Sequence, residues 1–534
     1  MHPFLSAFSD RVSELNVPPE NQIAVLPSKR ACSFFQSIHT QKAGSGKWLP
    51  ETITLDALAS RISEFEISDP IYNTFALYEA YQNTLGTDAV SLPEFMSWSD
   101  ILLTDFNDIE AYQLNPEKVF KELVDYTEIE HFSFLNQPLT EKQERFRRFW
   151  KSLNRIFNEF QNNLKNQGLG TAGMIMRNAA NLVDDFLKNN PEIFITVGGF
   201  NALSNSELHL FKKIQDAGRG RIYYDLNSAF LDKKTNAGLF IRKNLEKGIG
   251  EILDYGIPVQ EKKMEISVFG ATNKLDQANA IAAILQKKGQ NYDATCLALA
   301  DESLLLPIIE RLPREIEKVN VTMGVGLSNF SFFTWMEDWM DLQMNFKSEG
   351  NLFPPERWSK FFLHPFSRLL DLTHPGEEGA SDLSRLTAKR YAKPNLSNLE
   401  DYFEILHDAV SRKDQSNPEY RAAAVGLEKI IAATGFLKSF EKSNELNWQA
   451  LSKIYRRTLS RSKLSLIGEP REGLQIMGVL ETRALGFSDL IVCSVDETHF
   501  PAQSHIESFI PFEIRMYHGL PGKREKEAIF SSRF

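Results

Sequence analysis

The sequence has few cysteines and no long hydrophobic run. Its three cysteines, Cys32, Cys296 and Cys493, lie far apart, each within an apolar stretch. This spacing fits neither a zinc site nor an iron–sulfur cluster, and it predicts free thiols in a reducing compartment. No apolar run approaches the length of a membrane span, and residues 1–20 lack the regions of a signal peptide. We therefore expect a cytoplasmic protein without a membrane partner, a metal or another cofactor.

An excess of positive charge is also missing. The chain has 60 Lys and Arg against 70 Asp and Glu, which gives a net charge of −10. No overall field therefore draws the protein to a polyanion, and any contact with nucleic acid must come from local basic patches. With 534 residues the chain is too long for one hydrophobic core, so we expect several domains.

Strand-like runs alternate with amphipathic helices in four stretches of the chain. Residues 22–27 read as a strand, followed by Ser28 as a helix N-cap and a helix to about residue 41. A second strand at 51–54 leads into a helix from Leu55. Such alternation predicts parallel α/β sheets. Further strands are predicted at 193–197, 221–225, 266–269, 295–300, 319–323, 474–479 and 489–495.

Two long stretches, about 68–190 and 353–463, read instead as helices with little strand signal. They include predicted helices at 71–81, 93–112 and 141–167. We therefore expect an α/β fold of two parallel-sheet domains, each interrupted by a helical insertion. The first domain comprises residues 1–66 and 191–262 around an insertion at 67–190. The second comprises 263–350 and 470–534 around an insertion at 351–469.

Six segments resemble AddB-like proteins of Bacteroidetes-type bacteria and occur in the order found in that family. They are Ile23–Phe35, Thr52–Ile62, Met96–Tyr112, Val197–Phe211, Leu299–Gly324 and Glu481–Pro501. Together they extend over nearly the whole chain. The resemblance implies two RecA-like domains in the architecture of UvrD- and RecB-like superfamily 1 helicases.

The phosphate-binding pattern of a working motor is absent. In GxxxxGK[ST], backbone amides cradle the triphosphate and the hydroxyl binds magnesium. The nearest match is AGSGKW at residues 43–48. When its GK is aligned with the GK of the pattern, Gln41 stands at the position of the first Gly and Trp48 at that of the Ser or Thr. It also precedes a predicted strand instead of joining a strand to its helix. These mismatches favour a plain Gly/Ser loop over a phosphate site.

Two further motor positions lack their carboxylates. The strand at 194–197 is followed by GGFN, and the next carboxylate is Glu207. A motor needs carboxylates there to hold magnesium and polarise water. Against the helicase motif V pattern AKGLEF, residues 482–487 read TRALGF, so Gly486 replaces the carboxylate. We therefore predict no ATP hydrolysis, and no catalytic or cofactor-binding residue.

Relatives of this kind carry a C-terminal PD-(D/E)XK nuclease domain, in which carboxylates and a lysine hold magnesium around a phosphate. The closest string here, Glu525–Glu527, lacks the ExK order and a β-type setting. The chain ends at Phe534, within a predicted helix that in relatives continues into a motif-VI-like segment. We expect a truncated second domain, as in a fragment or a frameshifted gene product.

Two basic helices contain the candidate DNA-binding residues. In residues 141–165, an apolar stripe predicts a buried face; it comprises Phe146, Phe149, Trp150, Leu153, Phe157, Phe160 and Leu164. The basic side chains beside it favour a solvated face over phosphate tracking; they are Arg145, Arg147, Arg148, Lys151 and Arg155. The charge pattern of the second basic stretch is equally consistent with DNA contact and with a plain solvated helix. This stretch contains Lys453, Tyr455, Arg456, Arg457, Arg461 and Lys463. Lys29 and Arg30 are weaker candidates.

Two further clusters have a plain structural interpretation. Asp105 and Asp108 lie one helical turn apart, but no third ligand is nearby, so capping or ion pairing is favoured over metal binding. His499 lies beside a proline turn after a predicted strand, where a lone histidine is more often structural than catalytic.

The resemblance implies a non-motor, helicase-like scaffold subunit of an AddAB/RecBCD-type helicase–nuclease, which repairs double-strand breaks by recombination. Its implied partners are DNA, as a duplex end or a single strand, and an AddA-type subunit that supplies translocation. Three alternatives stay open. They are an ATPase with a divergent phosphate loop, a protein-interaction scaffold that never contacts DNA, and a non-functional remnant of a broken gene.

Overall fold

The computed structural model describes twelve stretches of the chain. They are residues 2–44, 46–131, 139–231, 236–255, 265–289, 292–345, 355–373, 381–389, 394–439, 447–465, 472–500 and 508–522. The chain folds into two compact units. Unit 1 comprises 1–68, 101–323 and 467–534, and unit 2 comprises 69–100 and 324–466. The residues expected as the first insertion, 67–190, are thus divided between the two units.

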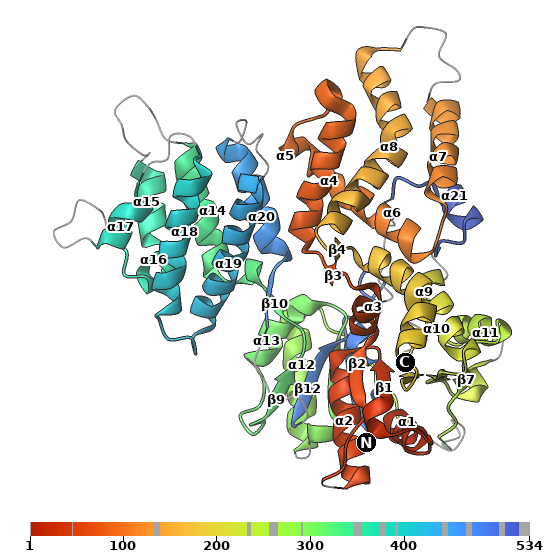
Figure 1. Cartoon of the computed structure of the whole chain (residues 1–534). Helices are drawn as coiled ribbons and strands as arrows, with labels where there is room; N and C mark the ends of the chain where they lie inside the picture. The colour runs from red at the N-terminus through yellow and green to blue at the C-terminus, as the bar shows by residue number, and fades with distance from the viewer. Residues whose placement is uncertain are drawn as a thin grey trace. The chain divides into compact units, whose positions relative to one another are not determined.

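Unit 1 contains a five-stranded parallel sheet in the order β2-β1-β5-β6-β7, of which Figure 1 labels β1, β2 and β7. Its strands are β1 (Gln22–Leu26), β2 (Glu51–Thr54), β5 (Phe194–Gly198), β6 (Gly220–Tyr224) and β7 (Glu251–Ile252). From β1 the chain passes through α2 (Lys29–Ala43) to β2 on one side. From β5 it passes through α10 (Asn205–Asp216) to β6 on the other side. The order therefore reverses between β1 and β5.

Side chains of β1 alternate between two hydrophobic cores because neighbouring residues of a strand face opposite sides of the sheet. Ile23 and Val25 join the core formed with α3 (Leu55–Ser63), α9 (Ala172–Asn189) and α10. Ala24 and Leu26 join the core formed with α1 (Pro3–Ser13) and α2. The expected N-cap at Ser28 is confirmed, since its hydroxyl oxygen accepts a hydrogen bond from the Ala31 N–H at 3.1 Å.

A second parallel sheet in unit 1 has the order β13-β8-β12-β9. Its strands are β8 (Thr295–Leu299), β9 (Val319–Val321), β12 (Leu474–Gly478) and β13 (Asp489–Cys493), with α12 (Lys274–Lys288) and α13 (Leu305–Ile309) beside them. The strand expected at 266–269 is wrong. Residues 265–270 form no strand, and the side chains of Ile266, Val268 and Phe269 are exposed.

The helical part of unit 1 contains most of α6 (Ser99–Ala111), α7 (Pro116–His131) and α8 (Glu141–Asn166). The expected buried face of α8 is confirmed for five of its seven residues, Trp150, Leu153, Phe157, Phe160 and Leu164. Phe146 is exposed and Phe149 is half-buried. The remaining elements of unit 1 are β3 (Glu66–Ile67), β4 (Leu169–Gly170), α11 (Leu239–Glu246) and α21 (Phe512–Tyr517).

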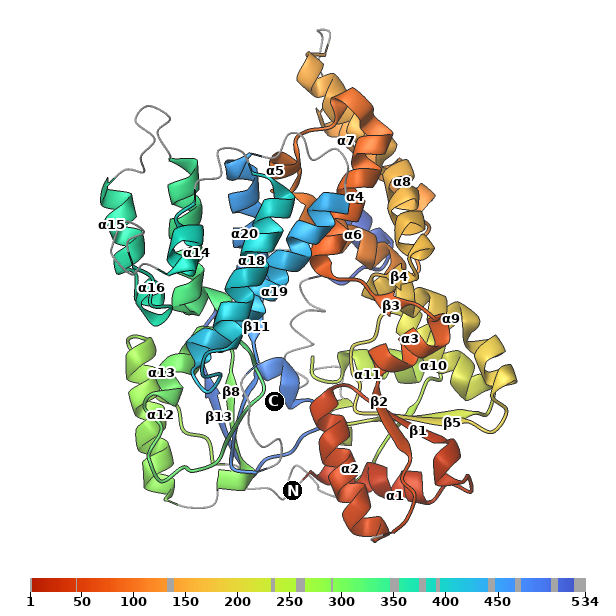
Figure 2. The same cartoon turned by 60° about the vertical axis from the view of Figure 1, so that its left-hand side comes forward.

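Unit 2 is a helical assembly with a small antiparallel pair, β10 (Val325–Gly326) and β11 (Lys463–Leu464). Figure 2 shows α14, α18, α19 and α20 running beside one another. Their ranges are Ser331–Met344, Leu396–Ser411, Pro418–Ser439 and Trp448–Arg461. The other helices are α4 (Pro70–Leu85), α5 (Leu92–Phe95), α15 (Pro355–Leu363), α16 (Pro365–Leu369) and α17 (Asp382–Thr387). Its core is rich in aromatic side chains, among them Trp335 and Trp339.

Candidate functional site

The first candidate site lies at the carboxyl ends of β1 and β5. In open α/β sheets, ligands bind outside the carboxyl ends of the strands where the strand order reverses, and this sheet reverses between β1 and β5. The two ends are followed by Pro27 and Ser28 on one side and by Gly199 on the other. The motor motifs that the resemblance implies would occupy these same positions. We refer to this place as the switch-point crevice.

Residues from elsewhere in the chain already fill the switch-point crevice. A Cβ atom built on Gly199 would lie 2.7 Å from the Ala484 methyl group, 3.2 Å from the Phe4 ring and 3.7 Å from Pro27. Ala484 is buried in the same hydrophobic core as Phe4 and Leu26. The segment that resembles helicase motif V therefore packs directly on the end of β5.

The backbone at Ala484 adopts a conformation that favours glycine. Its φ is +61°, in the left-handed region that costs an L-residue about 1–2 kcal/mol. The methyl group of Ala484 is the atom nearest to the place that a Cβ on Gly199 would take.

His2 holds the same segment from the N-terminal side. Its Nδ1 accepts a hydrogen bond from the Gly486 N–H at 3.1 Å. Its ring also packs edge-on against Phe34 and Phe487, with centroids 4.4 Å and 5.7 Å away. Burial lowers the pKa of His2 to about 4, so the ring is neutral near pH 7 and can serve as the acceptor.

Arg30 is a buried cation beside this segment. Only 9 % of the residue is exposed, and burial lowers the pKa of its guanidinium to about 10. The negative charge of Glu481 opposes that shift. Within the described residues, neither Arg30 Nη1 nor Glu481 Oε2 has a hydrogen-bond partner, although both atoms are buried. Arg30, expected only as a weak DNA candidate, thus faces the protein interior.

Glu207 and Arg483 are two further charged residues of this region. Glu207 lies in α10, where its carboxylate accepts a hydrogen bond from the Ser204 N–H at 2.5 Å as part of a capping box. Burial raises the pKa of Glu207 and lowers that of Arg483, and the charge of each partner opposes the shift of the other. The first carboxylate after β5 therefore caps a helix.

The loop nearest to a phosphate-binding pattern lies elsewhere. Residues 43–48 begin at the last residue of α2 and precede β2, as the sequence predicts. Gly44 ends α2 with a φ of +83°, and Trp48 is exposed. Ser45 lies outside the described residues, as does the string Glu525–Glu527.

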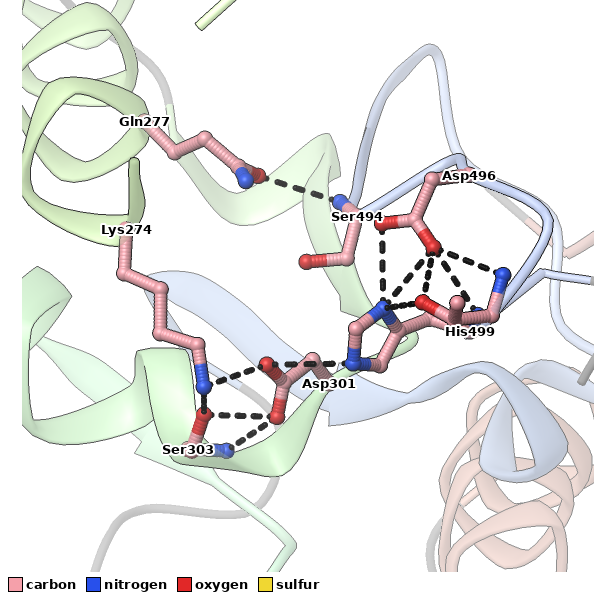
Figure 3. Close-up of polar contacts among 8 residues, drawn as sticks. Lys274, Gln277, Asp301, Ser303, Ser494, Asp496 and His499 are labelled. Carbon is pink, nitrogen blue, oxygen red and sulfur yellow. Dashed lines mark hydrogen bonds and ion pairs between the residues drawn. The ribbon is translucent and has the colours of Figure 1, made fainter. Parts of the chain in front are cut away.

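A second polar cluster lies at the carboxyl ends of β8 and β13 (Figure 3). Asp301 Oδ2 lies 2.9 Å from Lys274 Nζ and 3.6 Å from His499 Nε2. The other ring nitrogen of His499, Nδ1, lies 2.9 Å from Asp496 Oδ1. His499 therefore bridges two carboxylates that follow neighbouring strands, which gives it the structural role that its position beside a proline turn favours.

Internal hydrogen bonds keep both carboxylates of this cluster ionised. Burial alone would raise the pKa of Asp301, but the Ser303 hydroxyl and Lys274 outweigh it and the pKa is lowered. Hydrogen bonds from Thr498 and His499 hold the pKa of Asp496 well below its usual range. Through Lys274 and His499 the cluster links the loops that follow β8 and β13.

The basic residues of α20, and Lys463 of β11 after it, differ in how exposed their side chains are. Arg457 is only 15 % exposed in its side chain, and it donates hydrogen bonds to the Met96 carbonyl oxygen at 2.5 Å and to Asp100. Arg461 also pairs with Asp100, and Arg456 Nε lies 2.6 Å from Glu337. The idea of one solvated basic face is therefore wrong for Arg457. Lys453, Arg456, Arg461 and Lys463 are exposed.

The basic residues of α8 lie on an exposed face and largely pair with nearby acids. Arg145 lies 2.6 Å from Glu141 one turn away. Arg147 and Lys151 both contact Glu128 of α7, at 3.1 Å and 2.9 Å. Arg148 is exposed as well. These contacts agree with the solvated face that the charge pattern favours.

Asp105 and Asp108 form ion pairs, as expected. Arg515 Nη2 lies 2.8 Å from Asp108 Oδ2, and Arg515 Nη1 lies 3.5 Å from Asp105 Oδ1. Asp105 also accepts hydrogen bonds from the Ser508 hydroxyl and the Phe509 N–H, at 2.5 Å and 2.7 Å. The pair therefore binds the segment 508–515 to α6, a contact that spans about four hundred positions and has no local signal.

Comparison of the chain with models of known protein families and with curated proteins finds no match. Among the described residues, no group of three His, Cys, Asp or Glu side chains is arranged to hold a metal ion. In the same part of the chain, none of the helices combines the length and the apolar character needed to cross a bilayer.

Proposed function

We propose that this chain is a non-motor, helicase-like scaffold subunit of an AddAB/RecBCD-type helicase–nuclease, acting on broken DNA ends. In this proposal the two sheets of unit 1 correspond to RecA-like domains that no longer bind nucleotide. An AddA-type partner supplies the translocation.

The observation that carries the proposal is the filled switch-point crevice. A nucleotide at this sheet would need backbone amides and carboxylates around its phosphates and magnesium. Here Ala484 and Phe4 close on Gly199, and the carboxylate of Glu207 caps α10. Together with the missing GxxxxGK[ST] pattern, this packing favours a chain that shares the helicase plan without its ATP chemistry.

The DNA-binding part of the proposal rests on the exposed basic residues of α20 and on Lys463 of β11. Lys453, Arg456, Arg461 and Lys463 supply positive charge on an otherwise acidic chain. Arg456 and Arg461 have acidic neighbours in unit 2, and DNA phosphates would have to compete with Glu337 and Asp100. We therefore expect moderate, salt-dependent binding that is not sequence-specific.

Isothermal titration with ATP and magnesium tests the non-motor assignment directly. We expect no binding and no phosphate release from the purified chain. A dissociation constant tighter than about 100 μM, within the usual range for enzymes and their substrates, would favour the ATPase with a divergent loop instead. Fluorescence anisotropy with a forked duplex, alone and with an AddA-type partner, then separates a DNA-facing scaffold from a scaffold that binds proteins only.

A further inference from the structure

The second sheet of unit 1 has an open edge at β13. Within the described residues β13 pairs with β8 alone, so alternate backbone N–H and C=O groups of β13 face away from the sheet. Its side chains are only partly covered, since Leu490 is exposed and Ile491 and Val492 are half-buried. An edge strand of this kind is a template to which another extended segment can add.

The same chain carries an unpaired segment with a β-type sequence. Residues 265–270 read EISVFG and form no strand, and Ile266, Val268 and Phe269 are 76 %, 91 % and 66 % exposed. Contiguous apolar surface of this kind marks interaction sites. The segment has six residues and β13 has five, so the two match in length. The chain therefore supplies both an open edge and a segment suited to it.

The connection to α12 limits how the segment can meet β13 of its own chain. The side-chain oxygen of Gln277, near the start of α12, accepts a hydrogen bond from the Ser494 N–H at 3.1 Å, so α12 begins beside the carboxyl end of β13 (Figure 3). The four steps from Gly270 to Lys274 span at most about 14 Å. The five residues of β13 extend over about 16 Å. The chain's own segment is therefore placed to meet β13 in the parallel direction.

The side chains favour the opposite direction. Parallel pairing would bring Glu265 to the Asp489 end of β13, and like charges side by side weaken strand pairing. Lys288 already pairs with Asp489 and so is not free to neutralise Glu265. Antiparallel pairing separates the two carboxylates. In one antiparallel register it also sets three apolar pairs opposite one another, Phe269 with Leu490, Val268 with Ile491 and Ile266 with Cys493.

We propose that residues 265–270 of one copy of this chain add antiparallel to the free edge of β13 in a second copy, and that the two copies exchange these segments across a two-fold axis. Each copy gives one segment and receives one, which closes the assembly at a dimer. The contact is small because each side adds one short strand, so we expect a weak dimer that dissociates on dilution. The inference does not depend on the non-motor function proposed above.

Sedimentation velocity across a concentration series tests the association. Wild type should form a dimer as its concentration rises. Val268→Lys and Leu490→Lys should each weaken the dimer about tenfold, because each substitution removes an apolar cross-strand pair twice in a two-fold assembly. Ile405→Lys changes a similarly exposed apolar side chain of α18 in unit 2, and should associate as wild type does.

Cysteine cross-linking identifies the chain that supplies the segment. Val268→Cys and Ile491→Cys are made in separate chains, mixed and oxidised, and the products are separated on a non-reducing denaturing gel. We expect a cross-linked dimer from the mixture, since the three native cysteines are buried. Ser267→Cys mixed with Ile491→Cys is the control. It should give little product, because successive side chains of a strand face opposite sides of the sheet.

Three results would overturn the proposed dimer. One is a wild type that stays monomeric at every concentration, and another is a pair of lysine variants that associate as tightly as wild type. The third is a chain with both Val268→Cys and Ile491→Cys that cross-links within itself while the mixture of single variants does not, which would show that the segment pairs with its own β13. Each of these results leaves the non-motor function standing, because the ATP titration tests that function separately.

Discussion

At the scale of single residues, the packing at the switch-point crevice depends on two residues. One has no space for a larger side chain, and the other must stay uncharged. Gly199 adopts a φ of +77° directly beneath the Ala484 methyl group, and His2 must stay neutral to accept from Gly486. Gly218, which has a similar φ but no neighbour within 4 Å, serves as the control for Gly199, and a ring that cannot titrate serves as the control for His2.

Gly199→Ala should destabilise unit 1 by about 2–4 kcal/mol, since a left-handed backbone and an overpacked contact combine their costs. Gly218→Ala is the control, because its φ is +67° but nothing lies within 4 Å of the added methyl group. The control should lose only about 1–2 kcal/mol for the backbone. Urea unfolding measures both, and equal losses would show that Ala484 does not press on Gly199. Gly199→Ala/Ala484→Gly should recover part of the larger loss.

The low pKa of His2 makes the protein less stable in mild acid. The unfolded chain takes up a proton near the ordinary value of 6.5, whereas the folded chain does so only near 4. Between these values the unfolded state holds more protons, so the free energy of unfolding falls as the pH falls, by about 3 kcal/mol in all. His2→Phe keeps an aromatic ring but cannot titrate. Urea unfolding at pH 5 and pH 7 should show a smaller difference for the variant, and an equal difference would contradict the assignment.

At the scale of elements, α20 shows why a basic run is not yet a binding surface. Arg457 and Arg461 lie one helical turn apart on α20 and both pair with Asp100, and Arg457 also donates a hydrogen bond to the Met96 carbonyl oxygen. Only Arg457 of the two is largely buried by these contacts. A DNA test must therefore leave Arg457 unchanged, since its loss would disturb the packing of α20.

Lys453→Ala/Arg456→Ala/Arg461→Ala should weaken binding to a forked duplex and flatten its dependence on salt. Each lost phosphate contact should reduce the slope of log K against log salt by about 0.9. Arg385→Ala/Arg412→Ala/Lys413→Ala removes the same charge from other exposed positions of unit 2, and should leave the slope unchanged. Anisotropy across a salt series measures both. Identical slopes for the two triple variants would place the DNA contact elsewhere, with α8 next to be tested.

The segment 265–270 has a β-type sequence but no partner strand within the described residues. Val268 is 91 % exposed, and Leu490 of the edge strand β13 is also exposed. Exposed apolar side chains of this kind promote self-association. Val268→Lys should therefore reduce association in sedimentation velocity while changing the free energy of unfolding by no more than about 0.5 kcal/mol. A large loss of stability would show that this side chain is buried in solution.

At the scale of the whole chain, distant segments meet within each unit. Arg515 is buried against Asp105 and Asp108, which attaches the last described segment to α6. In unit 2, residues 69–100 pack with 324–466. Each unit is therefore built from pieces that are far apart in the chain.

Arg515→Leu should lower the free energy of unfolding by about 3–5 kcal/mol, because it removes the cation that compensates the buried carboxylate of Asp105. Burial raises the pKa of Asp105 to about 6, against an ordinary value near 3.8. In that interval the folded state holds more protons, so stability falls as the pH rises, and the variant should lose more at pH 8 than at pH 5. Arg412→Leu, at an exposed pair with Asp408, should change stability by about 0.5 kcal/mol or less. A loss in Arg515→Leu that is independent of pH would mean that Arg515 does not lower the pKa of Asp105.

The sequence by itself determined the local elements and the missing motor motifs. The strand at β1, the N-cap at Ser28 and the buried stripe of α8 follow from alternation, capping and helical spacing, which depend on residues only a few positions apart. The segment 265–270 shows the limit of such signals, because a β-type run becomes a strand only when another strand is there to pair with it.

Only the tertiary structure decided what lies in the switch-point crevice and which charges are free. Residues hundreds of positions apart meet in the contact of Ala484 with Gly199 and in the pairing of Arg457 with Asp100. The burial of Arg30 likewise depends on the packing of the whole unit. The residues next to them in the sequence do not indicate these partners, since burial and charge compensation depend on how whole helices and strands pack. A charge pattern read along one helix therefore cannot distinguish a free cation from one already neutralised inside the fold.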